Sequence, residues 1–303
     1  MSHSVVVGAG ATGRAVARQL AATGEQVRLV TRSGTGPQGA GIELVALDAS
    51  DAQAMARVTK GASTLFNCAM PRYDRWPQEF PALAAGMLAA AERTGTGYVM
   101  LGNAYAYAPT QGPVFENDPL APTTIKGRVR AEIWAEALDA YKARRVRVTE
   151  VRASGFLGHG AYSIYNLMVT PNVVAGKPAY YPGDLDVANS WTFTEDAART
   201  LIAVSRSGLA WGRAWHVPSL TGISARAVTN RLAALAKKPP PQLMRMTAKD
   251  VHEAGRTDSI IAEVEEMLYL SDLPFELSSA ATSKAFAVKA SSLDDALYDT
   301  LKP

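Results

Sequence analysis

The sequence contains little cysteine, little histidine and almost no surplus of charge. Its one cysteine, Cys68, cannot form an internal disulfide, and the histidines His3, His159, His216 and His252 show no metal-ligand spacing. The 31 Lys and Arg residues nearly balance the 28 Asp and Glu residues, for a formal charge of +3. This balance lacks the basic excess that is typical of nucleic-acid binding. We therefore expect neither a bound metal nor a nucleic-acid partner.

Long apolar runs are also missing. The longest, Ala82 to Ala91, is too short to cross a bilayer. The N-terminal Met1-Ser2-His3-Ser4 lacks the basic flank of a signal peptide. These features predict a cytoplasmic protein without a membrane partner. The length of 303 residues allows one large domain or two smaller ones.

The first half of the chain alternates short β-branched runs with alanine-rich stretches, which predicts a parallel sheet covered by helices on both faces. The expected strands are Ser4–Val7, Val27–Thr31, Glu43–Leu47, Thr64–Ala69, Tyr98–Leu101, Arg147–Val151 and Arg213–Val217. The expected helices are Arg14–Ala22, Asp51–Val58, Phe80–Arg93, Lys126–Ala143, Glu195–Val204 and Asp258–Leu268, and the alternating pattern is lost over Ser224–Ala236. The stretch 154–186 is rich in Gly, Pro, Tyr and Asn and is expected to form loops over a site.

A glycine-rich loop follows the first expected strand directly. Gly8-Ala9-Gly10-Ala11-Thr12-Gly13 matches G-x-G-x-x-G and opens the first expected helix, which is the context that supports a dinucleotide site. The glycines permit a tight turn and let backbone N–H groups approach a pyrophosphate at the positive end of the helix. The expected pyrophosphate-binding residues are Gly8, Gly10, Ala11, Thr12 and Gly13.

These patterns together predict an α/β fold of the Rossmann type, a doubly wound parallel sheet with a smaller, interleaved C-terminal substrate domain. Residues 1–154 and 187–222 are expected to form the dinucleotide-binding domain. Residues 155–186 and 223–303 are expected to form the substrate-binding region.

The second expected strand ends without the acidic residue that would accept a hydrogen bond from an NAD ribose. Arg32 and Ser33 occupy that position, and Arg14 follows the third glycine of the loop. A guanidinium there suits a 2′-phosphate. The sequence therefore favours NADP(H), with NAD(H) as the alternative if Arg32 is a solvated loop residue.

Several later segments match a known family in order and spacing. They are Leu47-Asp48-Ala49, Phe66-Asn67-Cys68-Ala69, Val151-Arg152-Ala153-Ser154-Gly155-Phe156-Leu157-Gly158, Trp191-Thr192-Phe193-Thr194-Glu195-Asp196-Ala197-Ala198 and Leu293-Asp294-Asp295-Ala296-Leu297. With the glycine loop, they make the chain resemble the short-chain dehydrogenase/reductase superfamily, in the extended branch that includes the NAD-dependent epimerase/dehydratase family and NmrA-like reductases. The resemblance implies that Asp48 and Ala49 meet the adenine and that Cys68 and Ala69 line the cofactor site.

The chain departs from that family at the catalytic positions. The segment that begins at Thr124 resembles the family's Y-x-x-x-K-x-x-x-E, which places Thr124 on the Tyr and Arg128 on the Lys, and Asn103 falls on the hydroxyl that orients the substrate. A Thr hydroxyl is too weak an acid to replace a phenol. Arg128 is still expected to bind the cofactor ribose, and Asn103 to donate to a substrate oxygen. The usual Tyr/Lys pair is therefore missing in this alignment.

Another group must then supply the proton, or the reaction needs none from this position. Lys126 lies two residues after Thr124, and lysine acts as the acid/base in the NmrA-like reductases of benzylic ethers that the chain resembles. Tyr105 follows the fifth expected strand, on the side of the sheet where ligands bind. Further candidates are Tyr107, His159, Tyr162 and Tyr165. Each of them, taken alone, also fits a purely structural role.

Three functions are compatible with these observations. The first is an NADP(H)-dependent oxidoreductase that acts on a small organic carbonyl, imine or enone, in a setting such as secondary metabolism. The second is a non-redox epimerase, dehydratase or cyclase on the same scaffold, and the third is a non-catalytic NADP-binding sensor. A small-molecule substrate is the expected partner. Relatives of this branch form homodimers through helices here expected at Phe80–Arg93 and Lys126–Ala143, or stay monomeric, and the sequence leaves both open.

Overall fold

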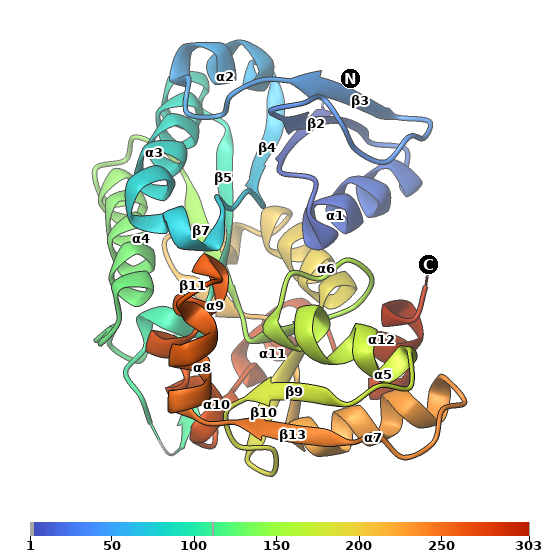
Figure 1. Ribbon diagram of the computed structural model, residues 1–303. Coiled ribbons are helices and arrows are strands. Elements are labelled where there is room, and N and C mark those ends of the chain that lie inside the picture. Colours follow the sequence, from blue (N-terminus) through green and yellow to red (C-terminus); the bar gives the residue numbers. More distant parts are fainter. Residues whose placement is uncertain (1–2, 111, 303) are drawn as a thin grey trace.

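A computed structural model describes residues 3–110 and 112–302 (Figure 1). Within these residues the largest element is a seven-stranded parallel sheet with the strand order β3-β2-β1-β4-β5-β7-β11. Its strands are β1 His3–Val7, β2 Gln26–Thr31, β3 Ile42–Ala46, β4 Ala62–Asn67, β5 Gly97–Asn103, β7 Val148–Ala153 and β11 Ala214–His216. The chain starts in the middle of the sheet and winds outward in both directions, so the predicted Rossmann fold is confirmed.

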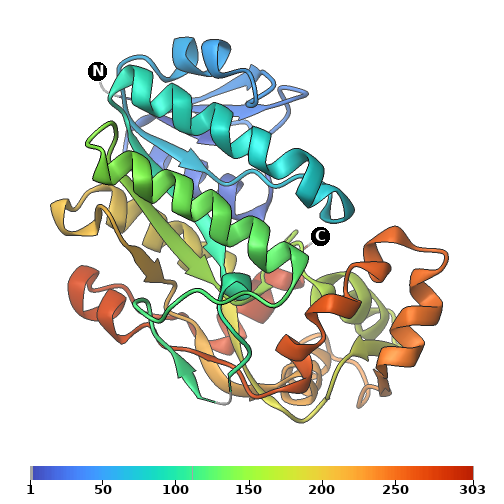
Figure 2. The ribbon, with the colours of Figure 1, turned by 90° about the vertical axis from the view of Figure 1, so that its left-hand side faces the viewer.

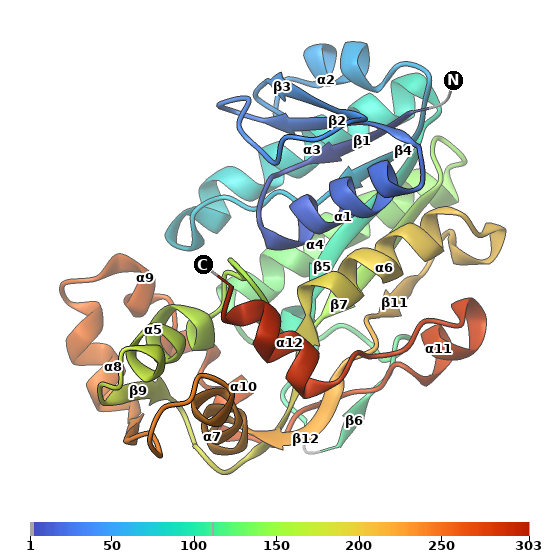
Figure 3. The same cartoon turned by 90° about the vertical axis from the view of Figure 1, so that its right-hand side faces the viewer.

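Helices cover both faces of this sheet. One face carries α1 (Ala11–Ala22) and α6 (Thr194–Ser205), which lie side by side in Figure 3. The other carries α2 (Ala52–Thr59), α3 (Trp76–Thr94) and α4 (Ile125–Lys142), and Figure 2 shows α3 beside α4. Because both faces are buried, the inner strands carry apolar residues on both faces, as β1 does, although β7 also buries the ion pair of Glu150 and Arg152.

The central strand β1 shows how this sequence produces two cores. Successive side chains of a strand point to opposite faces. Val5 and Val7 therefore enter the core beneath α3 and α4, and Val6 enters the core beneath α1 and α6. The uninterrupted valine run thus contributes side chains to the hydrophobic cores on both faces of the sheet.

The C-terminal half adds small sheets at the carboxyl ends of the large sheet's strands. The strands are β6 Pro113–Val114, β8 Gly155–Leu157, β9 Ala179–Pro182, β10 Ala188–Phe193, β12 Leu220–Ser224, β13 Leu243–Met246 and β14 Glu276–Leu277. They pair as β12-β10-β8, β13-β9 and β14-β6. The helices are α5 Thr170–Val174, α7 Ala225–Leu235, α8 Ala248–Gly255, α9 Ser259–Ala262, α10 Tyr269–Asp272, α11 Ala280–Phe286 and α12 Leu293–Thr300.

Residues 187–222, which were expected to belong to the dinucleotide-binding domain, contribute to both the seven-stranded and the three-stranded sheet. Between residues 187 and 222, α6 and β11 belong to the large sheet's layers, whereas β10 and β12 form the three-stranded sheet with β8. Strand β10 passes directly into α6, so this segment joins the two parts of the molecule. The expected interleaving of the C-terminal region with the dinucleotide fold is therefore present in the chain path, and the exact domain boundaries stay a prediction.

Two expected segments take a different form. The stretch 154–186 holds β8, a π-helical turn at Tyr165–Val169, α5 and β9 in addition to loops. The expected helix Asp258–Leu268 is broken into α9 and a 3-10 turn at Glu265–Met267, and α10 follows it. The breaks let this segment present apolar side chains to the inside while its acidic side chains reach α4. No helix of the described residues is long and apolar enough to span a membrane.

Candidate active site

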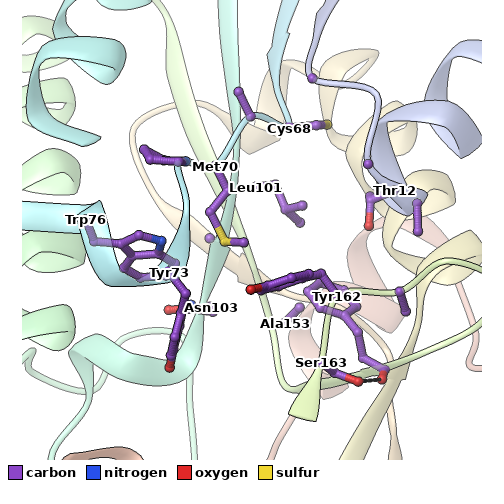
Figure 4. A pocket seen from close by; sticks show the side chains of 18 of the residues that line it. Thr12, Cys68, Met70, Tyr73, Trp76, Leu101, Asn103, Ala153, Tyr162 and Ser163 are labelled. Atoms are coloured by element: carbon purple, nitrogen blue, oxygen red, sulfur yellow. Dashed lines mark hydrogen bonds between the residues drawn. The ribbon is translucent and has the colours of Figure 1, made fainter. Parts of the chain in front are cut away.

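A large cavity lies between the carboxyl ends of the parallel strands and the C-terminal half. Its volume is about 900 Å³. The wall includes Val7, Leu101 and Ala153, which lie at or near the ends of β1, β5 and β7, and residues such as Tyr162 and Trp191 from the opposite side. Figure 4 shows side chains from both walls pointing into the same space. This is the crevice in which open α/β sheets bind their ligands.

The glycine loop forms one end of the cavity, as predicted. Gly8 has a φ of +97°, and a Cβ there would lie 2.8 Å from the backbone of Ala69. A Cβ on Gly13 would overlap the carbonyl oxygen of Gly8. A Cβ on Gly10, in contrast, would meet nothing within 4 Å. Two glycines therefore permit the turn itself, and the third leaves open space beside the backbone.

That open space lies at the start of a helix. Helix α1 begins at Ala11, and its N-cap, Gly10, has no side chain to satisfy the first N–H groups. Ala11, Thr12 and Gly13 all line the cavity. Unpaired N–H groups at the positive end of a helix form a site for an anion. The described residues therefore fit the pyrophosphate of a dinucleotide.

The expected adenosine residues are only partly brought together. Arg32, Asp48 and Ala49 line the cavity beside the glycine loop. The backbone N–H and the hydroxyl of Ser50 donate to Asp48 at 3.0 and 2.7 Å. These two hydrogen bonds lower the pKa of Asp48, and the nearby Arg32 guanidinium lowers it further.

Arg14 and Ser33, also expected there, do not line the cavity. The Arg14 side chain is exposed and turns back to donate to the carbonyl of Ala9 at 2.7 Å. Ser33 is exposed and exchanges a hydrogen bond with Thr35 at 2.7 Å. Each side chain thus has a hydrogen-bond partner within its own loop, and the expected contact of both with the adenosine end of the cofactor stays a prediction.

Cys68 and Ala69 follow β4 and line the middle of the cavity, as predicted. Burial raises the pKa of the Cys68 thiol to about 12. A thiol with so high a pKa is not a nucleophile at neutral pH. Among the described residues, no group of His, Cys, Asp and Glu side chains is arranged to hold a metal ion.

Asn103 and Tyr105 line the cavity beyond Cys68, at the end of β5. The Asn103 side chain accepts a hydrogen bond from the Tyr105 backbone N–H at 3.2 Å, which fixes the turn after the strand. The Tyr73 hydroxyl donates to the Tyr105 hydroxyl at 3.4 Å. Burial raises the pKa of Tyr105, so its phenol stays protonated at neutral pH.

The other three expected catalytic residues lie outside the cavity. Thr124 is the N-cap of α4 and accepts from the Gly127 N–H at 3.0 Å, so its hydroxyl starts the helix. Arg128 is exposed and faces the carbonyl of Thr123. Neither lines the cavity, so the structure does not bring them together with Asn103 and Tyr105, and their expected roles stay predictions.

Lys126 is neither a solvated charge nor a wall residue. Its side chain is completely buried and forms ion pairs with Glu263 and Glu266. Its ammonium also lies 4.5 Å from the centre of the Tyr73 ring. Two carboxylates and an aromatic ring therefore surround Lys126, and of the neighbouring pair Tyr73 and Lys126, Tyr73 lines the cavity and Lys126 does not.

Arg130 lines the cavity and was missed by the sequence analysis. It is buried, donates to the carbonyl of Leu101 at 3.1 Å, and lies over the rings of Trp76 and Phe80 at 4.8 and 4.5 Å. Burial lowers the pKa of Arg130 to about 10, which leaves it cationic at neutral pH. Lys126 and Arg130 are four residues apart and share one face of α4. Sliding the expected Y-x-x-x-K match by two residues would have found this pair.

The remaining candidates separate into two groups. Tyr162 and Tyr165 line the cavity. His159 is exposed near the C-terminus of the chain, and Tyr107 is buried elsewhere, where its hydroxyl contacts His216 at 2.7 Å. His159 and Tyr107 are therefore outside the candidate active site.

Solved structures of similar fold come from sugar-nucleotide enzymes. A dTDP-glucose 4,6-dehydratase from Streptomyces venezuelae, solved with NAD bound, has a TM-score of 0.78 at 18% identity, covering 98% of this chain and 95% of its own. A UDP-glucuronic acid 4-epimerase from Bacillus cereus, also with NAD, has a TM-score of 0.79 at 12% identity with the same coverage. A UDP-glucose 4-epimerase from Thermotoga maritima has a TM-score of 0.77 at 14% identity, covering 98% and 97%.

These identities are low enough that the structural likeness establishes the fold alone. No curated protein sequence matches the chain. The sequence profile described as the NAD dependent epimerase/dehydratase family matches residues 4–215, which confirms the predicted resemblance. The chain therefore belongs to the NAD-dependent epimerase/dehydratase family.

Proposed function

We propose that this protein binds a nicotinamide dinucleotide along the cavity and transfers hydride to a small organic acceptor. The observation that carries the proposal is the continuity of one cavity from the glycine loop, past Cys68, to Asn103 and Tyr105. The pyrophosphate would lie against Gly10, and the nicotinamide would reach the end of β5. NAD is bound in structures of the similar dehydratase and epimerase.

The bound, reduced cofactor would supply the hydride, and the chain's own residues would supply orientation and a proton. Tyr105 stays protonated, so its hydroxyl is suited to donate a hydrogen bond and then a proton to an acceptor oxygen or nitrogen. Asn103 would donate to the same atom, and Arg130 would hold positive charge beside it. The acceptor gains one hydride on carbon and one proton, which ends on oxygen for a carbonyl, on nitrogen for an imine and on the neighbouring carbon for an activated double bond. A carbonyl, an imine or an activated double bond fits this balance.

The second candidate is an epimerase or dehydratase that uses the cofactor transiently, and family membership favours it. Such an enzyme must first remove a proton from an alcohol, which requires a base. Burial disfavours the phenolate form of both Tyr105 and Tyr73. The two phenols therefore begin the reaction protonated, with no phenolate base formed in advance, and this starting state supports the reductive reaction.

We further propose a preference for NADP(H). The support is Arg32, which lines the adenosine end of the cavity where a ribose 2′-phosphate would lie. An Arg32→Ala variant is expected to lose affinity for NADPH while its affinity for NADH stays unchanged. Equal affinity of the wild-type protein for both cofactors would refute the preference and leave NAD(H) as the cofactor.

The test begins with binding of NADPH and NADH, followed by a single turnover with a panel of ketones, imines and enones. Oxidation of bound NADPH with formation of an equal amount of reduced acceptor would establish the reductase. Conversion of a sugar nucleotide without net change in the cofactor would establish the alternative. Failure to bind either cofactor would refute both.

A further inference from the structure

The two ends of the cavity differ in chemistry. The end formed by residues 7–69 contains the glycine loop, and none of the described residues in that part of the wall is aromatic. The other end, which we call the aromatic end, is formed by residues 70–79, by Tyr105 and by the C-terminal half. If the proposed function is right and the cofactor takes the glycine end, the aromatic end is left for the substrate.

Two groups of rings form the aromatic end. In the first, Trp76 lies 5.3 Å from Tyr73 and 5.9 Å from Tyr105, measured between ring centres. In the second, Tyr165 lies 5.2 Å from Trp191 and 6.3 Å from Tyr181. Figure 4 shows Tyr73, Trp76 and Met70 on one side of the space and Tyr162 reaching in from the other. A molecule at this end would therefore lie between ring surfaces.

The polar tips of the second group are bound to the protein itself. The Tyr165 hydroxyl donates to Thr229 at 3.1 Å, and the Trp191 indole N–H donates to the carbonyl of Ile223 at 2.8 Å. The Tyr181 hydroxyl donates to Ser271 at 3.4 Å. These residues thus contribute ring surface to the cavity rather than free donors.

Positive charge is scarce at the aromatic end. Among the described residues from 153 to 302, none that lines the cavity is charged. Arg72 lines the cavity, but both its Nε and Nη2 donate to Asp74, at 3.1 and 2.9 Å. Arg130 lies deep in the wall between Trp76 and Phe80. A ligand with negative charge at its outer end would meet the carboxylate of Glu79 and the neutralised guanidinium of Arg72.

A nucleoside diphosphate carries negative charge that proteins usually match with Arg, Lys or free N–H groups. Transfer of that charge from water to an aromatic wall without such partners is costly. Binding of an uncharged ring compound has no such free-energy cost, and the compound gains contact with the rings of the wall. We propose that the substrate of this protein is an uncharged molecule with a planar or apolar body and a reducible group, not a nucleotide sugar of the kind named for its structural neighbours.

The inference is tested on the protein saturated with the cofactor it binds. Acetylnaphthalene (the ketone), acetylnaphthoate with its carboxylate on the far ring (the keto acid) and UDP-glucose are titrated separately by calorimetry. The ketone and the keto acid share the ring system and the reducible group, and they differ in charge at the end away from that group. The ketone is expected to bind saturably, and the other two to bind at least about tenfold more weakly. Binding of UDP-glucose or of the keto acid that is as tight as that of the ketone, or tighter, would overturn the inference. Failure of cofactor binding, seen in the first step, would instead refute the proposed function.

A matched pair of variants tests whether the ketone binds at the aromatic end of the cavity. Tyr162 lines the cavity, Tyr180 does not, and both are 47% exposed, so neither substitution removes a core residue. Tyr162→Ala is expected to weaken ketone binding by up to about tenfold, the value of a good ring contact, with the cofactor affinity unchanged. Tyr180→Ala is expected to change neither. Equal ketone affinity in the wild type and in Tyr162→Ala would contradict the proposed place of the substrate.

Discussion

Lys126 donates to Glu266 at 3.0 Å across 140 positions of sequence, and so joins the start of α4 to the segment that follows α9. Glu263 of the same segment also pairs with this ammonium. The segment carries Val264 and Met267, which line the aromatic end of the cavity. One buried cation thus holds part of the cavity wall against the dinucleotide fold.

Lys126→Met is expected to lower the free energy of unfolding. The two carboxylates would lose their counter-charge, but at 34% and 22% exposure they would regain some water, so we expect about 2 kcal/mol rather than the larger cost of a fully buried pair. Urea unfolding measures the change. Lys142→Met is the control, because Lys142 pairs with Asp139 on the surface and should contribute less than about 0.5 kcal/mol. Equal stability of the two variants would refute this role of Lys126.

Most of the dinucleotide fold was predictable because its signals are local. Most strands of the large sheet are short runs rich in apolar and β-branched residues, and the G-x-G-x-x-G loop lies at the junction of β1 and α1. The aromatic end was not predictable in the same way. Strand β10 went unnoticed because its sequence, Ala188 to Phe193, mixes polar and aromatic residues, and its partners lie far away in the chain.

The direction of side chains on α4 could not be decided from spacing alone. The pattern Y-x-x-x-K can be aligned so that it begins at Thr124 or at Lys126. In both alignments other residues replace the Tyr and the Lys. In the structure Thr124 is the N-cap of α4, Arg128 is exposed and Arg130 lines the cavity, which favours the alignment at Lys126. The burial of Lys126 depends on Glu263 and Glu266, which no local pattern connects to it.

Gly10→Ala is expected to abolish most cofactor affinity without loss of stability. Gly10 has a φ of −68°, which alanine adopts freely, and the new Cβ would meet no protein atom within 4 Å. It would instead occupy the space that a pyrophosphate needs, so we expect the Kd for NADPH to rise about tenfold or more. The control is Gly208→Ala, since a Cβ there also meets open space and the residue lies outside the cavity. A Gly10→Ala protein that binds NADPH normally would show that the loop does not hold the pyrophosphate.

Arg130→Met and Arg128→Met separate the two alignments of α4. Arg130 lines the cavity and Arg128 is exposed, although both are arginines on the same helix. We expect Arg130→Met to reduce turnover by about 100-fold, the effect of removing one charged group that faces the reacting atoms. Arg128→Met should leave turnover and NADPH affinity unchanged. The reverse result would restore the alignment that places Arg128 on the cofactor ribose.

Tyr105→Phe tests the proton donor. Loss of the hydroxyl is expected to lower the turnover of an accepted ketone by a factor of about 100 or more, with the NADPH affinity unchanged. Because burial raises the pKa of Tyr105, the wild-type rate should stay level through neutral pH instead of falling as a low-pKa acid loses its proton. Tyr73→Phe, which removes only the hydroxyl that donates to Tyr105, should have a smaller effect. Full activity of Tyr105→Phe would assign the proton to another group.

Because of His216, we expect the folded protein to lose stability on mild acidification. The His216 side chain is buried against Tyr107, and its Nδ1 is hydrogen-bonded to the carbonyl of Ser278 at 2.6 Å. Burial lowers the pKa of His216 from 6.5 to about 3. The unfolded chain therefore binds this proton at a higher pH than the folded chain does, so the stabilisation is complete above pH 6.5 and is lost as the pH falls from 6.5 towards 3. Between pH 6.5 and pH 5 this amounts to about 1.5 kcal/mol. Urea unfolding should show this decrease in the wild type and its absence in His216→Gln, which has no group that titrates there; parallel pH profiles of the two proteins would contradict the assignment.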